Sequence, residues 1–76
     1  MEDLILYIVK NIVSKPDEVR VEDGGERDGA KVYNLIVAEE DKGFVIGRQG
    51  RVAKALRLIV KTAALKEDMK INIDII

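Results

Sequence analysis

The chain contains no cysteine and no histidine. Without thiols it can hold neither a disulfide bridge nor a thiolate-bound metal ion. Its only hydroxyl nucleophiles of the Ser/Thr kind are Ser14 and Thr62, and neither has a base beside it in the sequence. The consecutive acids Glu39–Asp41 do not face one point, and no P-loop lysine follows the glycines. We therefore expect a protein that is not an enzyme, with no cofactor and no metal site.

Aromatic side chains are also scarce, since Tyr7, Tyr33 and Phe44 are the only three. That number is too small for a surface that binds nucleic acid mainly by stacking bases. The apolar run Leu4–Val9 is far too short to span a bilayer. The N-terminal residues 1–3 carry acid where a signal peptide carries base. We expect a cytoplasmic protein that makes no membrane contact.

Charge is nearly balanced overall but unevenly placed along the 76 residues. The net charge is −1, yet residues 42–66 contain seven cations and no acid, while the remainder has six cations against fourteen acids. A hydrophobic content of 47% is typical of one globular domain, which we place at residues 1–76. The split indicates a face that meets an anion. A solvated basic helix face is the alternative interpretation.

Apolar periodicity predicts an α+β domain. Helical spacing of apolar residues is found in residues 3–13 and 51–66, and alternation or β-branched content in the other apolar segments. The predicted elements are a helix at 3–13, strands at 18–22 and 31–38, a short helix at 41–46, a long helix at 51–66 and a strand at 71–75. This αββααβ order predicts a three-stranded mixed sheet with three helices on one face. Residues 23–29 are expected to form a mobile loop.

The segment Val45–Val52 carries the candidate site. It is interpreted as the end of the short helix, with Asp41 as its N-cap, followed by a Gly-x-x-Gly turn and the start of the long helix. Gly47 is expected to take a left-handed backbone, and Gly50 to let the chain re-enter a helix. The first amides of that helix have no partner within it and can bind phosphate. Arg48 and Arg51 add positive charge beside them.

The other residues of the long helix fall on different sides of it according to their chemistry. A broad apolar face is predicted to pack on the sheet, and a basic strip runs along one flank. Of that strip we expect Lys54 to contact phosphate with Arg51, whereas Arg57 and Lys61 lie further from the turn and are expected to be solvated. Leu58, Leu65 and the nearby Ala55 fall outside both groups. They are either isolated exposed residues or a stripe for self-association, which we favour.

The run Gly47–Ala55, together with the aliphatic pair before it, resembles the signature of the KH domain. The order of elements is similar to the type II arrangement, and the length is similar to that of the small bacterial KhpA (YlqC-like) family. This resemblance implies a protein that binds single-stranded RNA, or sometimes DNA, in RNA regulation or RNA chaperoning. It also implies a homodimer or a pair with a second KH protein. A KH fold used chiefly for protein interaction, with a vestigial groove, is the alternative.

The resemblance also implies residue roles. Gly47, Arg48, Gln49 and Gly50 would hold the nucleic-acid backbone, next to Arg51 and Lys54. An aliphatic groove would be formed by Val45, Ile46, Val52 and Ala53, with Ile36 or Val37 completing it. The loop at residues 23–30 would form the opposite wall. That loop is acidic overall, which should weaken phosphate contact on that side.

Overall fold

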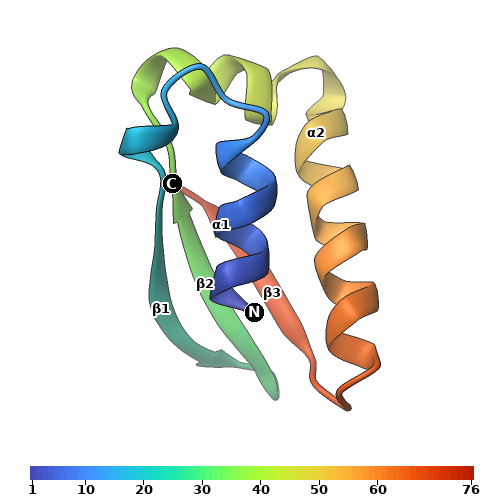
Figure 1. The fold of residues 1–76 in the computed structure, drawn as a ribbon. Helices are drawn as coiled ribbons and strands as arrows, with labels where there is room; N and C mark the ends of the chain where they lie inside the picture. Colours follow the sequence, from blue (N-terminus) through green and yellow to red (C-terminus); the bar gives the residue numbers. More distant parts are fainter.

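The computed structural model describes all residues, 1–76, as a three-stranded sheet with helices on one face (Figure 1). In that view α1 lies in front of the sheet, and the second part of α2 runs beside the edge strand β3. The elements are α1 (Glu2–Lys10), the 3-10 helix η1 (Pro16–Glu18), β1 (Arg20–Arg27), β2 (Ala30–Ile36), α2 (Glu39–Leu65) and β3 (Ile71–Ile75).

The sheet has the order β1-β2-β3 and is mixed, as predicted. β1 pairs with β2 in antiparallel register, and β2 pairs with β3 in parallel register through the long α2 crossover. Tyr33 and Leu35 on β2 point toward the helices together with Ile71 and Ile73 on β3, since alternate strand residues share a face. They pack on a cluster from both helices that consists of Ile5, Val9, Val45, Leu56, Val60 and Ala64.

The hairpin differs from the expectation of a mobile loop at residues 23–29. β1 continues through Gly24 and Gly25 by means of a register shift between Asp23 and Glu26. The turn itself is only Asp28-Gly29, with φ angles of 54° and 82°. Two central residues with positive φ match the twist of the flanking strands. The prediction was wrong because glycine-rich composition indicates a bulge within a strand as well as a loop.

Two helices were expected between residues 41 and 66, and the structure has the single element α2 instead. It therefore contains two α-helices rather than three. α2 is nevertheless interrupted, because residues 47–50 leave helical dihedral angles. We call these four residues the α2 break. The helical parts on either side run in different directions, the first across the top of the molecule and the second down along β3 (Figure 1).

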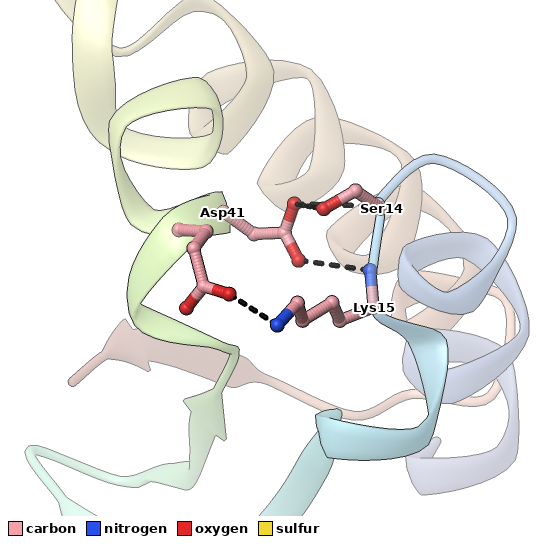
Figure 2. Close-up of polar contacts among 4 residues, drawn as sticks. Ser14, Lys15 and Asp41 are labelled. Atoms are coloured by element: carbon pink, nitrogen blue, oxygen red, sulfur yellow. Dashed lines mark hydrogen bonds and ion pairs between the residues drawn. The ribbon is translucent and has the colours of Figure 1, made fainter.

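The first part of α2 begins at Glu39, so Asp41 is not the N-cap that was expected; Ala38 occupies that position. Asp41 is buried instead and binds the segment after α1. Its carboxylate accepts hydrogen bonds from the Ser14 amide (2.9 Å), the Ser14 hydroxyl (2.7 Å) and the Lys15 amide (3.1 Å), as Figure 2 shows in part. Lys15 also forms an ion pair with Glu40. These contacts fix the helical part that leads into the α2 break.

The hydrogen bonds from Ser14, first its hydroxyl and then its amide, hold the pKa of Asp41 below its usual range. A carboxylate with three donors is stabilised in its ionised form. The junction between the two segments is thus a hydrogen-bonded polar contact.

Candidate functional site

The α2 break has an unusual backbone. Gly47 is extended, with φ −69° and ψ 179°, so the expectation that it adopts a left-handed backbone was wrong. The left-handed residues are the next three, Arg48, Gln49 and Gly50, with φ angles of 49°, 62° and 68°. Two consecutive non-glycine residues in this region are uncommon and cost conformational free energy. Such a backbone is typical of a segment retained for a function rather than for stability.

The two glycines of the α2 break face open space. A methyl group added to Gly47 or Gly50 would meet no atom within 4 Å. Gly50 needs a residue without a side chain because of its positive φ, but Gly47 has dihedral angles that alanine also adopts. Nothing inside the protein therefore requires glycine at position 47. The open side of Gly47 leaves room for another molecule to come close to the backbone.

The cations around the α2 break are free of acids. The four ion pairs of the chain are Lys15–Glu40, Arg27–Asp74, Lys31–Asp23 and Lys42–Glu39. Of the seven cations in residues 42–66, only Lys42 takes part in one. Arg48, Arg51 and Lys54 are exposed and unpaired. They gather positive charge at the start of the second helical part, where the free amides favour an anion.

A surface hollow lies directly beside the α2 break. It is lined by Gly43, Phe44, Gly47, Arg48, Arg51 and Val52. The structure thus brings the two predicted phosphate contacts, Arg48 and Arg51, to one depression together with an exposed aromatic ring. Sequence reasoning had assigned Phe44 no role, although its position three residues before Gly47 places it one helical turn away.

The predicted aliphatic groove residues divide by burial. Val45 and Ala53 lie in the interior, whereas Ile46 is about half exposed (48%) and Val52 is partly exposed. Val45 and Ala53 can therefore support a groove only from beneath. Ile36 lies on the face of the sheet away from the helices, because its neighbours Leu35 and Val37 both belong to the core. The structure does not bring Ile36 to the α2 break.

Arg57 differs from the solvated residue that was expected. Its Nε donates a hydrogen bond of 3.1 Å to the carbonyl oxygen of Ile73 on β3, and its side chain is partly buried. No sequence signal could have identified this contact, because it joins positions sixteen residues apart through the packing of α2 on β3.

A second surface feature lies on the outer side of α2. Leu58 and Leu65 are 68% and 67% exposed, and Ile59 is 50% exposed. With the exposed Ala55 they form an apolar strip along the second helical part. Exposed apolar residues of this kind are either isolated surface residues or a contact surface for another protein.

Neither a metal cluster nor a membrane helix is found. No group of three or more histidine, cysteine or acidic residues converges on one point. None of the helices combines the length and the apolar character needed to cross a bilayer.

Comparison with known proteins assigns the family. A model of the KhpA/KhpB KH domain matches residues 2–75. The chain belongs to this KH-domain family. It is similar to the RNA-binding protein KhpA of Listeria monocytogenes, with 47% identity over 100% of this chain and 99% of the relative. The RNA-binding protein KhpA of Clostridium perfringens is 46% identical over the full length of both chains. No solved structure matches the chain significantly.

More distant relatives keep the same length. The RNA-binding protein KhpA of Chlamydia trachomatis is 36% identical over 99% of this chain and 95% of its own. The family predicted from the run Gly47–Ala55 is thus confirmed, and the mixed three-stranded sheet is consistent with a KH fold.

Proposed function

We propose that this chain binds single-stranded RNA without catalysis, through the α2 break and the surface beside it. Its arrangement is that of a type II KH domain if the two helical parts of α2 are counted separately, which gives the order αββααβ. The relatives that it resembles along its full length are named as RNA-binding proteins. Single-stranded DNA offers the same phosphate spine and is a secondary ligand of the site.

One observation carries the proposal. In the α2 break, Gly47 has no packing reason to be glycine, Arg48 and Gln49 adopt an uncommon left-handed backbone, and the nearby cations lack partners. A sugar-phosphate backbone accounts for all three, because it needs close approach, free amides and positive charge. If the segment were only a tight turn between two helices, this would explain the glycine at position 50 but not the other features.

The residues of the site have separate roles in this proposal. Gly47 and Gly50 admit the backbone, Arg48 and Arg51 contact phosphates, and Gln49 offers a hydrogen-bonding side chain. Lys54 lies one turn after Arg51 and contacts the next phosphate. Ile46 and Val52 supply the exposed aliphatic surface for bases. Val45 and Ala53 support them from the core.

The test is the double substitution Arg48→Asp with Gln49→Asp. We expect at least a tenfold loss of affinity for a short single-stranded RNA in fluorescence anisotropy, because charge repulsion replaces phosphate contact. Thermal unfolding should change little, since neither side chain has a partner in the protein. Lys10→Glu on α1 is the control for charge at another exposed site and should lower affinity far less. Unchanged affinity of the double variant would show that the α2 break is not the binding surface.

The apolar strip supports a second part of the proposal. Ala55, Leu58 and Leu65, with Ile59 between them, form the contact for a second copy of this chain or for another KH protein. Pairing two weak RNA sites raises affinity by effective concentration, which suits a protein of RNA regulation or RNA chaperoning. The strip equally favours the alternative function, a protein-interaction module whose RNA groove is vestigial.

Two single variants test the pairing. Leu58→Glu or Leu65→Glu should lower the mass measured by light scattering toward that of a monomer, because each places a charge in an apolar contact. Lys61→Glu, on the neighbouring basic flank, is the matched control. A wild-type protein that stays monomeric at high concentration would refute the homodimer. Self-association without any RNA binding would favour the interaction module.

A further inference from the structure

Arg57 is the one cation of the basic flank that the fold holds in place. Lys54 and Lys61 lie three residues before it and four after it, so all three share a side of α2. Both lysines are exposed and have no hydrogen-bond partner in the protein, whereas Arg57 is half-buried and bonded to β3. Two mobile ammonium groups thus flank one guanidinium of fixed position.

The hydrogen bond fixes Arg57 at the free edge of the sheet. Lys31 donates its amide to the carbonyl of Lys70, and Ile76 donates its amide to the carbonyl of Leu35. In a parallel ladder these bonds mean that the even-numbered residues of β3 face β2. The carbonyl of Ile73 therefore points to the outer edge, where no strand follows. The guanidinium lies in the angle between α2 and this edge.

The hydrogen bond to Ile73 uses only one of the N–H donors of Arg57. A guanidinium carries five N–H donors in a planar fork, and the bond to Ile73 uses Nε. No acid lies within ion-pair distance, so the Nη groups are left without a protein acceptor. A guanidinium whose free N–H groups point in a fixed direction is suited to a planar partner with two adjacent acceptors.

We infer that Arg57 reads a base that presents two adjacent acceptors, which is guanine or cytosine. The inference rests on the proposed function, because it requires RNA at the α2 break. Arg57 follows Arg51 by six residues, or about 9 Å along a helix, so a strand held at the break and running along this flank reaches it within one or two nucleotides. Mobile lysines on either side are suited to phosphates, and the anchored fork between them to a base edge.

The choice of these two bases follows from donor and acceptor patterns. Guanine presents two acceptors, O6 and N7, side by side, and these match two parallel N–H donors. In an unpaired strand cytosine presents O2 and N3 side by side in the same way. Adenine presents N7 beside the N6 amino group, which is a donor and faces another donor at Arg57. Uracil has no such pair, because its N3–H donor lies between O2 and O4. A bidentate arginine contact of this kind discriminates by about fivefold or more.

The test compares short oligo(U) RNAs that carry a single G, a single C or a single A at each position in turn. For the full-length wild type we expect one position at which G or C binds at least about fivefold better than A, and the better of the two is the base that Arg57 reads. Arg57→Lys keeps the positive charge and a donor for Ile73 but removes the fork. It should abolish this difference while changing affinity for oligo(U) less than twofold. Lys61→Arg, which adds an unanchored fork one turn away, is the matched control and should leave the preference unchanged.

The outcomes separate the two proposals. A wild type that binds RNA without preferring G or C over A, or a preference that survives Arg57→Lys, overturns the assignment of Arg57. An equal loss of affinity for all RNAs in Arg57→Lys also overturns it, because Arg57 would then be a phosphate contact. A wild type that binds none of these RNAs refutes the proposed function itself. Thermal unfolding of each variant establishes that the folded protein is being compared.

Discussion

Two segments of this chain contain a pair of glycines, and the surroundings of these glycines differ. In the bulge of β1, a methyl group added to Gly24 would lie 2.9 Å from Cγ1 of Val32, a buried residue. Gly24 is thus required by the close packing of β1 against Val32 on β2. In the α2 break, a methyl group on Gly47 would touch nothing. The same residue type is required by packing in one place, and in the proposed function it leaves room for a ligand in the other.

The charges of the two segments follow the same division. Asp23, beside the β1 bulge, is paired with Lys31, and Arg27 at the end of β1 is paired with Asp74 on β3. In both pairs the charge is neutralised by a neighbour within the fold. The cations of the α2 break have no such neighbour. The proposed site therefore rests on unpaired charge together with a glycine that packing does not require, in addition to the Gly-x-x-Gly pattern.

The comparison predicts its largest effect on stability at Gly24. Gly24→Ala should lower the free energy of unfolding by about 1–3 kcal/mol, because the added methyl group overpacks against Val32, which has little freedom to move. Urea unfolding followed by circular dichroism measures this. RNA affinity of the folded variant should equal that of the wild type. A Gly24→Ala protein as stable as the wild type would show that the bulge relaxes and that the glycine is not required there.

The reverse result is predicted for Gly47. Gly47→Ala should leave the free energy of unfolding within about 0.5 kcal/mol of the wild type, since its backbone suits alanine and the space is open. Affinity for single-stranded RNA should fall by up to about tenfold, or about 1.4 kcal/mol, because the methyl group lies where the nucleic-acid backbone approaches. Undiminished affinity would mean that the ligand does not pass close to this glycine.

A smaller effect is expected at the junction that supports the α2 break. Asp41→Asn should lower stability at neutral pH, because the amide oxygen of asparagine replaces only one of two accepting oxygens. The pKa of Asp41 is lowered by folding, so its contribution is present above the unfolded value and is lost as the pH falls below about 4. Melting temperatures of wild type and variant should therefore converge on acidification. A difference that is constant with pH would exclude the ionised carboxylate as the cause.

Much of the fold was predictable from local patterns. Alternating isoleucines identified β3, and the apolar stripe of α2 identified its packing face. The family was recognisable because residues 47–55 are contiguous in the sequence. What failed depended on tertiary contacts. The extension of β1 through Gly24 requires Val32 across the ladder, and the role of Asp41 requires Ser14, which is 27 residues away.

The candidate site was likewise predictable only in part. Its contiguous residues, Gly47 to Lys54, could be named from the sequence. The anchoring of Arg57 could not, because helical spacing alone gives it the same flank as Lys54 and Lys61. Only the packing of α2 against the outward carbonyl of Ile73 separates the three. The backbone of the α2 break was also beyond sequence reasoning, which assigned the left-handed position to Gly47 rather than to the three residues that follow it.

The most direct test of the central claim is a titration of the isotope-labelled protein with short single-stranded RNA, followed by the chemical shifts of the backbone amides. If the α2 break holds the RNA backbone, the largest shifts occur at residues 47–51, with Arg57 responding through its side-chain Nε–H. Shifts confined to the apolar strip at Leu58 and Leu65, or no shifts at all, would contradict it.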